Sequence, residues 1–315
     1  LGDVYKRQEL RVVMATEREL NKRIKSIKNI SQVTSALAAV SASKASRAQK
    51  QVEATRNYAE KAFEILQNLA SQPGVGQSMH PLLHTRDDIK NSGFILITGD
   101  RGLCGSYNSN MVAYAEAFLA KLETPTQLIT VGRKGRDLMI RRGYNVVAAF
   151  DDLPDPPSLL DITPIAQMAT EEYMKGTFDQ VFIAYTDYIN LISRSPAVKQ
   201  LLPLKPLDYK GWAVSELLSG VDLAGASGRT YTYEPSPVLL LDTVVPRFTQ
   251  LQVFQSSLEA LASEHSARRV AMNNATDNAG ELVEIFTLDR NTARQASITT
   301  EILDIVGGAE ALAEG

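Results

Sequence analysis

The feature that most constrains this chain is the stretch from Ala15 to Gln72, which contains no glycine and no proline. Helices of globular proteins are usually roughly 8–20 residues long, so a breaker-free stretch of this length predicts an unusually long helix. Pro73 and Gly74 then end the pattern. Apolar residues recur in it at intervals of three and four, as on one buried helical stripe: Leu20, Ile24, Ile27, Ile30, Val33, Leu37 and Val40.

A second long helix is predicted at the other end of the chain. Asp242 or Thr243 is the expected N-cap, and Pro246 then falls in the first turn, where its missing N–H costs little. Up to Val306 the only breaker is Gly280. At about 1.5 Å per residue each helix would be roughly 80–90 Å long, whereas the residues between them would form a body roughly 40 Å across. We therefore expect the two helices to form an antiparallel coiled coil that projects from a globular body.

The first helix carries a basic run that bears on its partners. Between Leu20 and Val52 there are seven basic residues and no acidic one: Lys22, Arg23, Lys25, Lys28, Lys44, Arg47 and Lys50. A solvated basic face is the simplest interpretation. In an antiparallel register the early part of the run would lie near four acidic residues of the second helix: Asp277, Glu281, Glu284 and Asp289. Binding of nucleic acid is not expected, because the net charge is −3 and no aromatic residues alternate with the basic ones.

The middle of the chain has a different pattern, in which short apolar strands alternate with helical stretches. Strands are expected at 94–97, 128–131, 146–150 and 181–185, and helices at 108–122, 133–142 and 162–175. This alternation predicts a Rossmann-like domain with a mainly parallel sheet covered by helices. The segment 204–234 contains scattered Pro, Gly and Ser, and is expected to be an irregular surface excursion.

These patterns divide the chain into four parts. Residues 1–13 precede Met14 and are treated as a non-native leader, 14–72 as the N-terminal coiled-coil helix, 90–237 as the α/β domain and 242–315 as the C-terminal coiled-coil helix. The fold class is therefore α/β with a terminal coiled coil. No apolar stretch approaches the roughly 20 residues that span a bilayer, and the single cysteine, Cys104, excludes an internal disulfide.

Three glycines after the first strand resemble a phosphate loop only superficially. Gly99, Gly102 and Gly105 have G-x-x-G-x-x-G spacing, not the dinucleotide pattern, and no Gly-Lys-Ser/Thr follows. The alternative is a tight strand-to-helix turn that needs positive φ angles. We favour the turn over a nucleotide site.

The remaining candidates for chemistry do not assemble a site in the sequence. His80 and His84 are four residues apart, but Pro81 interrupts a regular helix and no third metal ligand is near. His265 is expected to be packed or solvated, and Cys104 has no neighbouring base that would make it a nucleophile. We therefore predict no catalytic residue, no cofactor and no metal on this chain.

Several segments, in order along the chain, resemble the γ-subunit family of F-type ATP synthases. They are KRIKSIKNISQVTSAL near the start, GDRGLCGSYN after the first strand, YEPSP before the last helix, then LASEHSARRVAMNNATDNAGELV, NTARQASIT and ITTEILDIVGGAEA. The last matches the family signature at Ile298, Thr299, Glu301, Asp304, Gly308 and Ala309. The resemblance spans residues 16–311. The chain departs from it at 37–39 and Arg269, where the family often has methionine.

The resemblance implies a non-catalytic central-stalk rotor of a proton-translocating ATP synthase, with one copy per complex. Its coiled coil would sit inside a hexamer of α and β subunits and couple rotation to the catalytic β sites, while the α/β domain would contact the ε subunit and the membrane c-ring. Arg294 and Gln295 would bind the catch loop of a β subunit, and Thr299 would lie in the apolar bearing. The absence of paired cysteines favours a bacterial enzyme, peripheral to the cytoplasmic face of the cell membrane.

Two other functions remain open from the residues alone. An enzyme that uses the α/β domain would bind a ligand at Gly99 to Gly105. A coiled-coil adaptor would form homodimers through its long helices, whereas a rotor would pair its own two helices. Nucleotide binding and the solution mass distinguish these alternatives.

Overall fold

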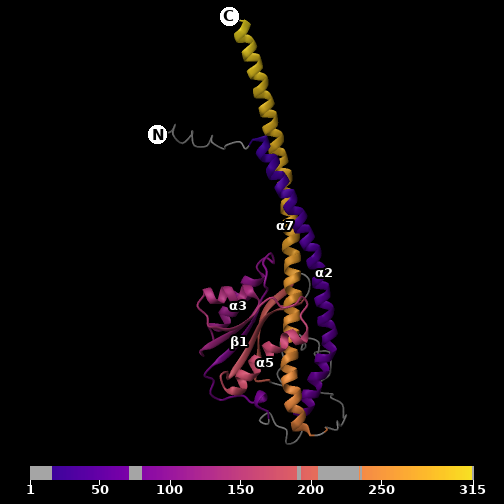
Figure 1. Ribbon diagram of the computed structural model, residues 1–315, viewed down its shortest axis with the longest axis vertical. Helices are drawn as coiled ribbons and strands as arrows, with labels where there is room; N and C mark the ends of the chain where they lie inside the picture. Colours follow the sequence, from indigo (N-terminus) through magenta and orange to yellow (C-terminus); the bar gives the residue numbers. More distant parts are fainter. Residues whose placement is uncertain (1–15, 71–79, 190–192, 205–233, 235, 314–315) are drawn as a thin grey trace. The chain divides into compact units, whose positions relative to one another are not determined.

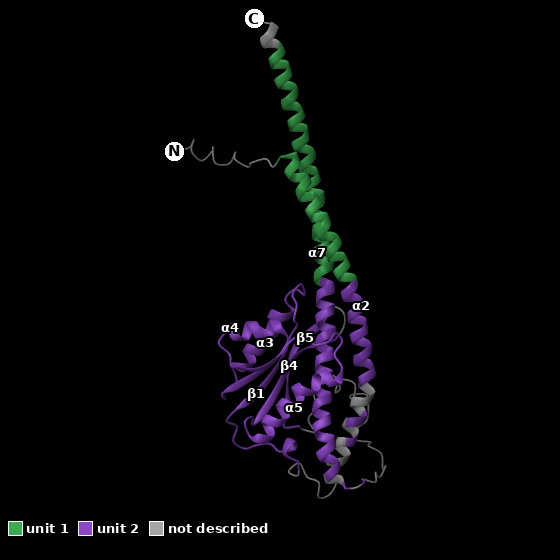
Figure 2. Ribbon diagram, viewed as in Figure 1, with its two compact units in different colours: residues 1–39, 271–315 green, residues 40–270 purple. Residues whose placement is uncertain are grey.

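The structure of this protein, a computed structural model, describes residues 16–70, 80–189, 193–204, 234 and 236–313. The chain forms two compact units, one from residues 1–39 and 271–315 and the other from residues 40–270 (Figure 2). Two long helices, α2 (Glu17–Ala70) and α7 (Pro237–Ala313), contribute to both units. The expected leader, residues 1–13, lies outside the described residues.

The N-terminus of α2 is capped by its own sequence. The Thr16 hydroxyl accepts a hydrogen bond from the Glu19 amide at 3.4 Å, and the Glu19 carboxylate accepts one from the Thr16 amide at 3.2 Å. This is a capping box, which satisfies two amides that a helix end leaves free. The helix therefore begins at Glu17, three residues after the boundary expected from Met14.

In the unit formed by 1–39 and 271–315, α2 and α7 pair in antiparallel fashion. The Thr34 hydroxyl lies 2.7 Å from that of Thr276, and the Arg23 guanidinium lies 6.0 Å from the ring centre of Phe286. Residue numbers thus rise along α7 as they fall along α2, which confirms the expected intramolecular coiled coil. Within the described part of the unit, the basic run forms no ion pair with the four acidic residues expected beside it.

A five-stranded sheet organises the unit formed by residues 40–270. Its order is β3-β2-β1-β4-β5, with β1 to β4 parallel and β5 antiparallel to β4. The strands are β1 (Ser92–Ile97), β2 (Thr126–Val131), β3 (Val146–Phe150), β4 (Gln180–Tyr188) and β5 (Arg194–Leu202). The helices are α3 (Tyr107–Leu119), α4 (Arg133–Arg141), α5 (Leu159–Lys175) and the short 3₁₀ helix η1 (Pro81–Leu83). The predicted mainly parallel sheet is confirmed.

Alternate residues of β1 divide the core between the two faces of this sheet. Phe94 and Leu96 pack with α3 and α4, whereas Ile95 and Ile97 pack with α5 and the first part of α7. Successive strand residues point to opposite faces, so a strand buried on both faces is apolar throughout. Figure 1 shows α3 and α5 on opposite sides of the sheet.

Two elements differ from the sequence prediction. Strand β5 was not predicted. It lies at the edge of the sheet and pairs only with β4, so it can carry Arg194, Pro196 and Lys199, which break the apolar pattern of a buried strand. The expected start of the last helix at 242 is wrong: α7 begins at Pro237, where the Ser236 hydroxyl accepts the Leu239 amide at 3.3 Å. Proline at the first helical position is favourable, and Pro246 lies inside the helix instead. The predicted surface excursion lies largely outside the described residues.

Candidate functional site

The glycine-containing loop after β1 is a contact site for α7. Of the three glycines, only Gly105 has the positive φ expected there (+61°), so that expectation is wrong for Gly99 and Gly102; Leu103 in the same loop also has a positive φ (+62°). Gly99 lies against α7, because a Cβ at this position would lie 2.7 Å from the Glu264 carboxyl group, which would then have to move. Arg268, one turn further along α7, donates to the carbonyl of Gly102 at 3.3 Å. A carboxylate against the loop disfavours a phosphate at this place.

The start of α3 completes the contact between this loop and α7. The Tyr107 hydroxyl is buried and donates to the carbonyl of Ala260 in α7 at 2.9 Å. The Cys104 sulfur accepts a hydrogen bond from the side-chain amide of Asn108 at 3.3 Å. Burial, and after it the charge of Glu264, raises the pKa of this thiol. A buried thiol with a raised pKa is a poor nucleophile, in agreement with the sequence interpretation of Cys104.

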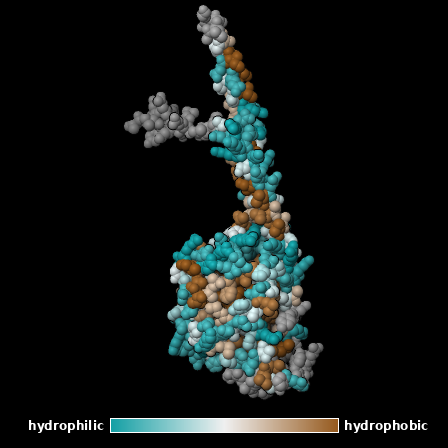
Figure 3. All heavy atoms as spheres, viewed as in Figure 1, coloured by the Kyte–Doolittle hydropathy of each residue, from teal (hydrophilic) through white to brown (hydrophobic). Residues whose placement is uncertain are grey.

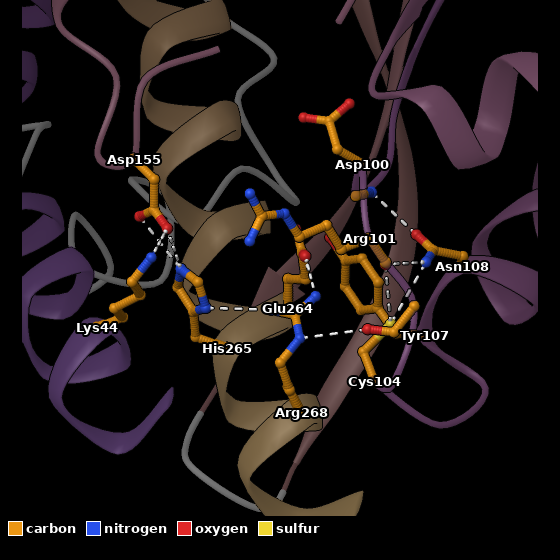
Figure 4. A network of polar contacts seen from close by, with 12 residues as sticks. Lys44, Asp100, Arg101, Cys104, Tyr107, Asn108, Asp155, Glu264, His265 and Arg268 are labelled. Atoms are coloured by element: carbon orange, nitrogen blue, oxygen red, sulfur yellow. Dashed lines mark hydrogen bonds and ion pairs between the residues drawn. The ribbon is translucent and has the colours of Figure 1, made fainter. Parts of the chain in front are cut away.

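A polar network fastens a loop of the α/β domain to both long helices (Figure 4). The Asp155 carboxylate accepts from Lys44 of α2 at 2.7 Å and lies 3.2 Å from Nε2 of His265 in α7. The hydrogen bond from His265, followed by that from Lys44, holds the pKa of Asp155 well below its usual range. Arg268 extends the network, since it lies 3.3 Å from Nδ1 of His265 and pairs with Glu264.

His265 of the last helix has a structural role in this network. His265 is buried, as the packed alternative predicted. Sequence reasoning missed its partner, because Asp155 is 110 residues away and follows no motif. The one available signal was a histidine in an otherwise alanine- and serine-rich helical stretch.

The other two histidines frame the helix η1. Nδ1 of His80 accepts from the Leu82 amide at 3.1 Å, and His84 is the C-terminal cap. Burial lowers the pKa of His80, although the charge of Asp242 opposes this. Among the described residues, no cluster of three His, Cys, Asp or Glu side chains has the arrangement of a metal site.

The predicted partner-contact residues lie on α7 in the unit formed by 1–39 and 271–315. Arg294, Gln295 and Thr299 are all exposed, and the Thr299 hydroxyl donates to the backbone carbonyl of Gln295 at 2.9 Å. The register of the coiled coil places the start of α2, Glu17, near residue 293. Beyond this level α7 has no partner among the described residues of α2, and Figure 2 shows it continuing alone.

The unpaired part of α7 carries exposed apolar side chains. They are Ile298 (49% exposed), Ile302 (55%), Leu303 (64%), Ile305 (71%) and Val306 (49%). In the space-filling view, apolar residues gather toward this end of α7 (Figure 3). Contiguous exposed apolar surface on a protein is typical of an interaction site. In the described portion of the chain, no helix has the length and apolar character needed to cross a membrane.

Comparison with known proteins gives one consistent result. Residues 16–312 match the family model described as ATP synthase. The ATP synthase gamma chain of Moorella thermoacetica is 40% identical over 300 residues, which cover 95% of this chain and all of the relative. That of Dehalococcoides mccartyi strain CBDB1 is 41% identical over the same shares.

Solved structures share the fold. A chain in the OSCP/F1/c-ring structure of the Euglena gracilis mitochondrial ATP synthase aligns with a TM-score of 0.61 and 20% identity, over 94% of each chain. A chain in the central stalk/c-ring structure from Tetrahymena thermophila aligns with a TM-score of 0.57 and 23% identity, over 77% of this chain and 99% of the other. With identity of about 40% to bacterial gamma chains over their full length, the chain belongs to the ATP synthase family as a gamma chain.

Proposed function

We propose that this gamma chain is the non-catalytic rotor of a proton-translocating F-type ATP synthase, in which it couples rotation of a c-ring to conformational change at the catalytic β subunits. The observation that carries the proposal is the antiparallel α2–α7 pair. Beyond the end of α2, α7 continues as a single helix with exposed apolar residues. Gamma-chain relatives about 40% identical over their whole length support the same role.

The coupling in this proposal is mechanical. A rotor changes the state of a catalytic subunit only if its contact free energy with that subunit differs between angles. A surface with charged, polar and apolar sectors meets this requirement, and α7 offers all three: Arg294 is charged, Gln295 polar and Leu303 apolar, and all are exposed. No ligand site on the chain is required.

The partners follow from the same role. The helix pair would enter a hexamer of α and β subunits as one copy per complex, and the α/β domain, proposed as 90–237, would contact an ε subunit and the c-ring. The similar structures carry the descriptions "central stalk/cring" and "OSCP/F1/c-ring". The F-type complex is membrane-associated, and we place the chain peripherally on the cytoplasmic face of a bacterial cell membrane.

Three residues are assigned to the contact with the head. Arg294 and Gln295 would hydrogen-bond to the catch loop of a β subunit, and Thr299 would lie in the apolar bearing. All three are exposed, so they are free to meet another subunit. Their exposed apolar neighbour Ile298 lies between them on the same helix.

Reconstitution tests the rotor function. Co-expression with α and β subunits of a related bacterium should give a complex that contains one copy of this chain and whose ATPase activity depends on it. If the chain instead forms a stable dimer and fails to join several well-matched heads, the adaptor alternative is correct. Nucleotide binding by the isolated chain would favour the enzyme alternative.

A double substitution, Arg294→Ala with Gln295→Ala, tests the assigned contacts. It should lower the ATPase rate or the yield of the complex without unfolding the chain, because both side chains are exposed. Arg141→Ala, in the last turn of α4 and also exposed, is the matched control and should leave both unchanged. Normal turnover and coupling in the double variant would remove the role from these residues.

A further inference from the structure

The face of α7 buried in the unit of residues 40–270 carries a polar stripe with one ionisable member. Its residues recur at intervals of four and three, as along one side of a helix: Gln252, Ser256, Glu259, Ser263 and Ser266. All are at most 7% exposed, and each has a side-chain oxygen with no hydrogen-bond partner among the protein atoms. Glu259 is 2% exposed, so its carboxyl group is held away from bulk water.

Glu259 faces a second carboxyl group. Its Oε1 accepts a hydrogen bond from the side-chain amide of Gln255 at 3.1 Å, whereas its Oε2 has no hydrogen-bond partner among the described protein atoms. The negative charge of Asp187 in β4 acts on the Glu259 carboxyl group and opposes its ionisation. Two ionised carboxylates only accept hydrogen bonds, so this approach is favourable only when one of them carries a proton.

The other groups around the pair set the charge balance. Lys199 of β5 lies 3.9 Å from an Asp187 oxygen and donates to the Tyr185 hydroxyl at 2.6 Å. Burial and the charge of Glu259 raise the pKa of Tyr185 well above its usual range, so this phenol is neutral. On α2, the charged residues at positions 50 and 53 are exposed.

Two carboxyl groups therefore share one ammonium group at a buried contact. With both carboxyls ionised, the cluster would hold one uncompensated negative charge, which is costly away from water. One bound proton makes the cluster neutral and turns an acceptor into a donor. Glu259 is the more deeply buried of the two, since the Asp187 side chain is 26% exposed.

We propose that Glu259 is protonated in the folded protein at neutral pH and donates a hydrogen bond to Asp187, so that a carboxyl–carboxylate pair, whose one negative charge is balanced by Lys199, fixes α7 against strands β4 and β5. Burial, then the charge of Asp187, raise the pKa of Glu259 far above its usual value, and Lys199 opposes them only in part. Glu259 is thus a positioning residue: it sets which face of α7 meets the sheet. The inference does not depend on the rotor function, although a rotor that passes torque from one unit to the other requires such a fixed contact.

The first test is the infrared spectrum of the full-length chain. The wild type should show the carbonyl stretch of a protonated carboxyl group at neutral pH, and Glu259→Gln should remove it. Asp187→Asn should also remove it, because Glu259 would then face an amide donor and Lys199, and would ionise. The control Glu123→Gln, exposed in the loop after α3, should retain the band.

The second test is the pH dependence of unfolding. The unfolded glutamate loses its proton near its ordinary pKa of 4.5, whereas the folded one retains it, so folding binds a proton and stability falls as pH rises. Between about pH 5 and about pH 8, the folded pKa, the folded-to-unfolded ratio of the wild type should fall relative to Glu259→Gln, by up to about tenfold per pH unit, and the two profiles should run parallel at higher pH. A carboxyl band that survives in Glu259→Gln, or profiles that are parallel within that pH window as well, would show that Glu259 is ionised. If Glu259→Gln fails to fold, the infrared spectrum of Asp187→Asn decides.

Discussion

Gly132 joins β2 to α4 with a backbone conformation that other residues rarely adopt. Its φ is +93°, and a Cβ there would lie 2.1 Å from the carbonyl oxygen of Thr98. Thr98 is held in place, because its amide donates to the Val131 carbonyl at 2.8 Å and its hydroxyl accepts from the Gly135 amide at 2.9 Å. We therefore predict that Gly132→Ala destabilises the α/β domain severely.

The magnitude follows from two separable costs. A side chain in the left-handed region costs about 1–2 kcal/mol. Moving Thr98 away sacrifices two hydrogen bonds worth about 1 kcal/mol each, so Gly132→Ala should cost about 3–4 kcal/mol in total. Gly143→Ala is the matched control: its φ is +83°, but no atom lies within 4 Å of its Cβ position. It should cost only the first term, about 1–2 kcal/mol.

Urea unfolding followed by hydrogen exchange provides the assay. Peptides that cover β1 and β2 should lose protection at a lower urea concentration in Gly132→Ala than in Gly143→Ala. Exchange is read peptide by peptide because a chain of two compact units need not unfold in a single step. Equal losses in the two variants would show that the contact with Thr98 is relieved at no cost, and would refute the argument from close approach.

Three further predictions concern the contacts of α7 with the α/β domain. Tyr107→Phe should lower the free energy of unfolding by about 1 kcal/mol, since it deletes one buried hydrogen bond, and the exposed Tyr114→Phe should change it little in the same urea titration. Asp155→Asn should cost about 1–2 kcal/mol at neutral pH. Because the folded pKa of Asp155 is depressed, this difference should shrink as pH falls below the usual 3.8, and a wild-type advantage that persists in acid would contradict the role of a charged Asp155 carboxylate as acceptor from His265 and Lys44. Cys104 should react with a thiol reagent only after unfolding, and fast labelling of the native chain would contradict its burial.

The regular elements were predictable because each has a strong local signal. The run of apolar residues in β1 and the breaker-free spacing of α2 fix their type without reference to the rest of the chain. The start of α7 was not predictable, because Pro237 and Pro246 both suit the first turn of a helix. The choice depended on the hydroxyl of Ser236, which caps the earlier one.

The contacts between elements were much less predictable than the elements. His265 meets Asp155 across 110 residues, and the proposed partner of Glu259, Asp187, lies on strand β4, so neither pair has a spacing that a sequence pattern reveals. Gly99 illustrates the same limit. Its place after a strand suggested a turn with positive φ, but its φ is not positive and it lies against the Glu264 carboxyl group of α7.

The polarity of α7 departs from the usual pattern of a helix in both units. In the unit of residues 40–270 it buries Ser256, Glu259 and Ser263 in addition to its apolar residues, and in the other unit it exposes Ile302 and Leu303. A helix that served only the stability of its own chain would bury its apolar residues and expose its polar ones. The exposed apolar residues are favourable once another protein covers them, as the proposed head would. The buried polar stripe replaces part of the apolar contact with the sheet. With the proposed proton on Glu259, balanced by Asp187 and Lys199, it gives α7 one preferred setting, which is what a rotating helix needs where it must not slip.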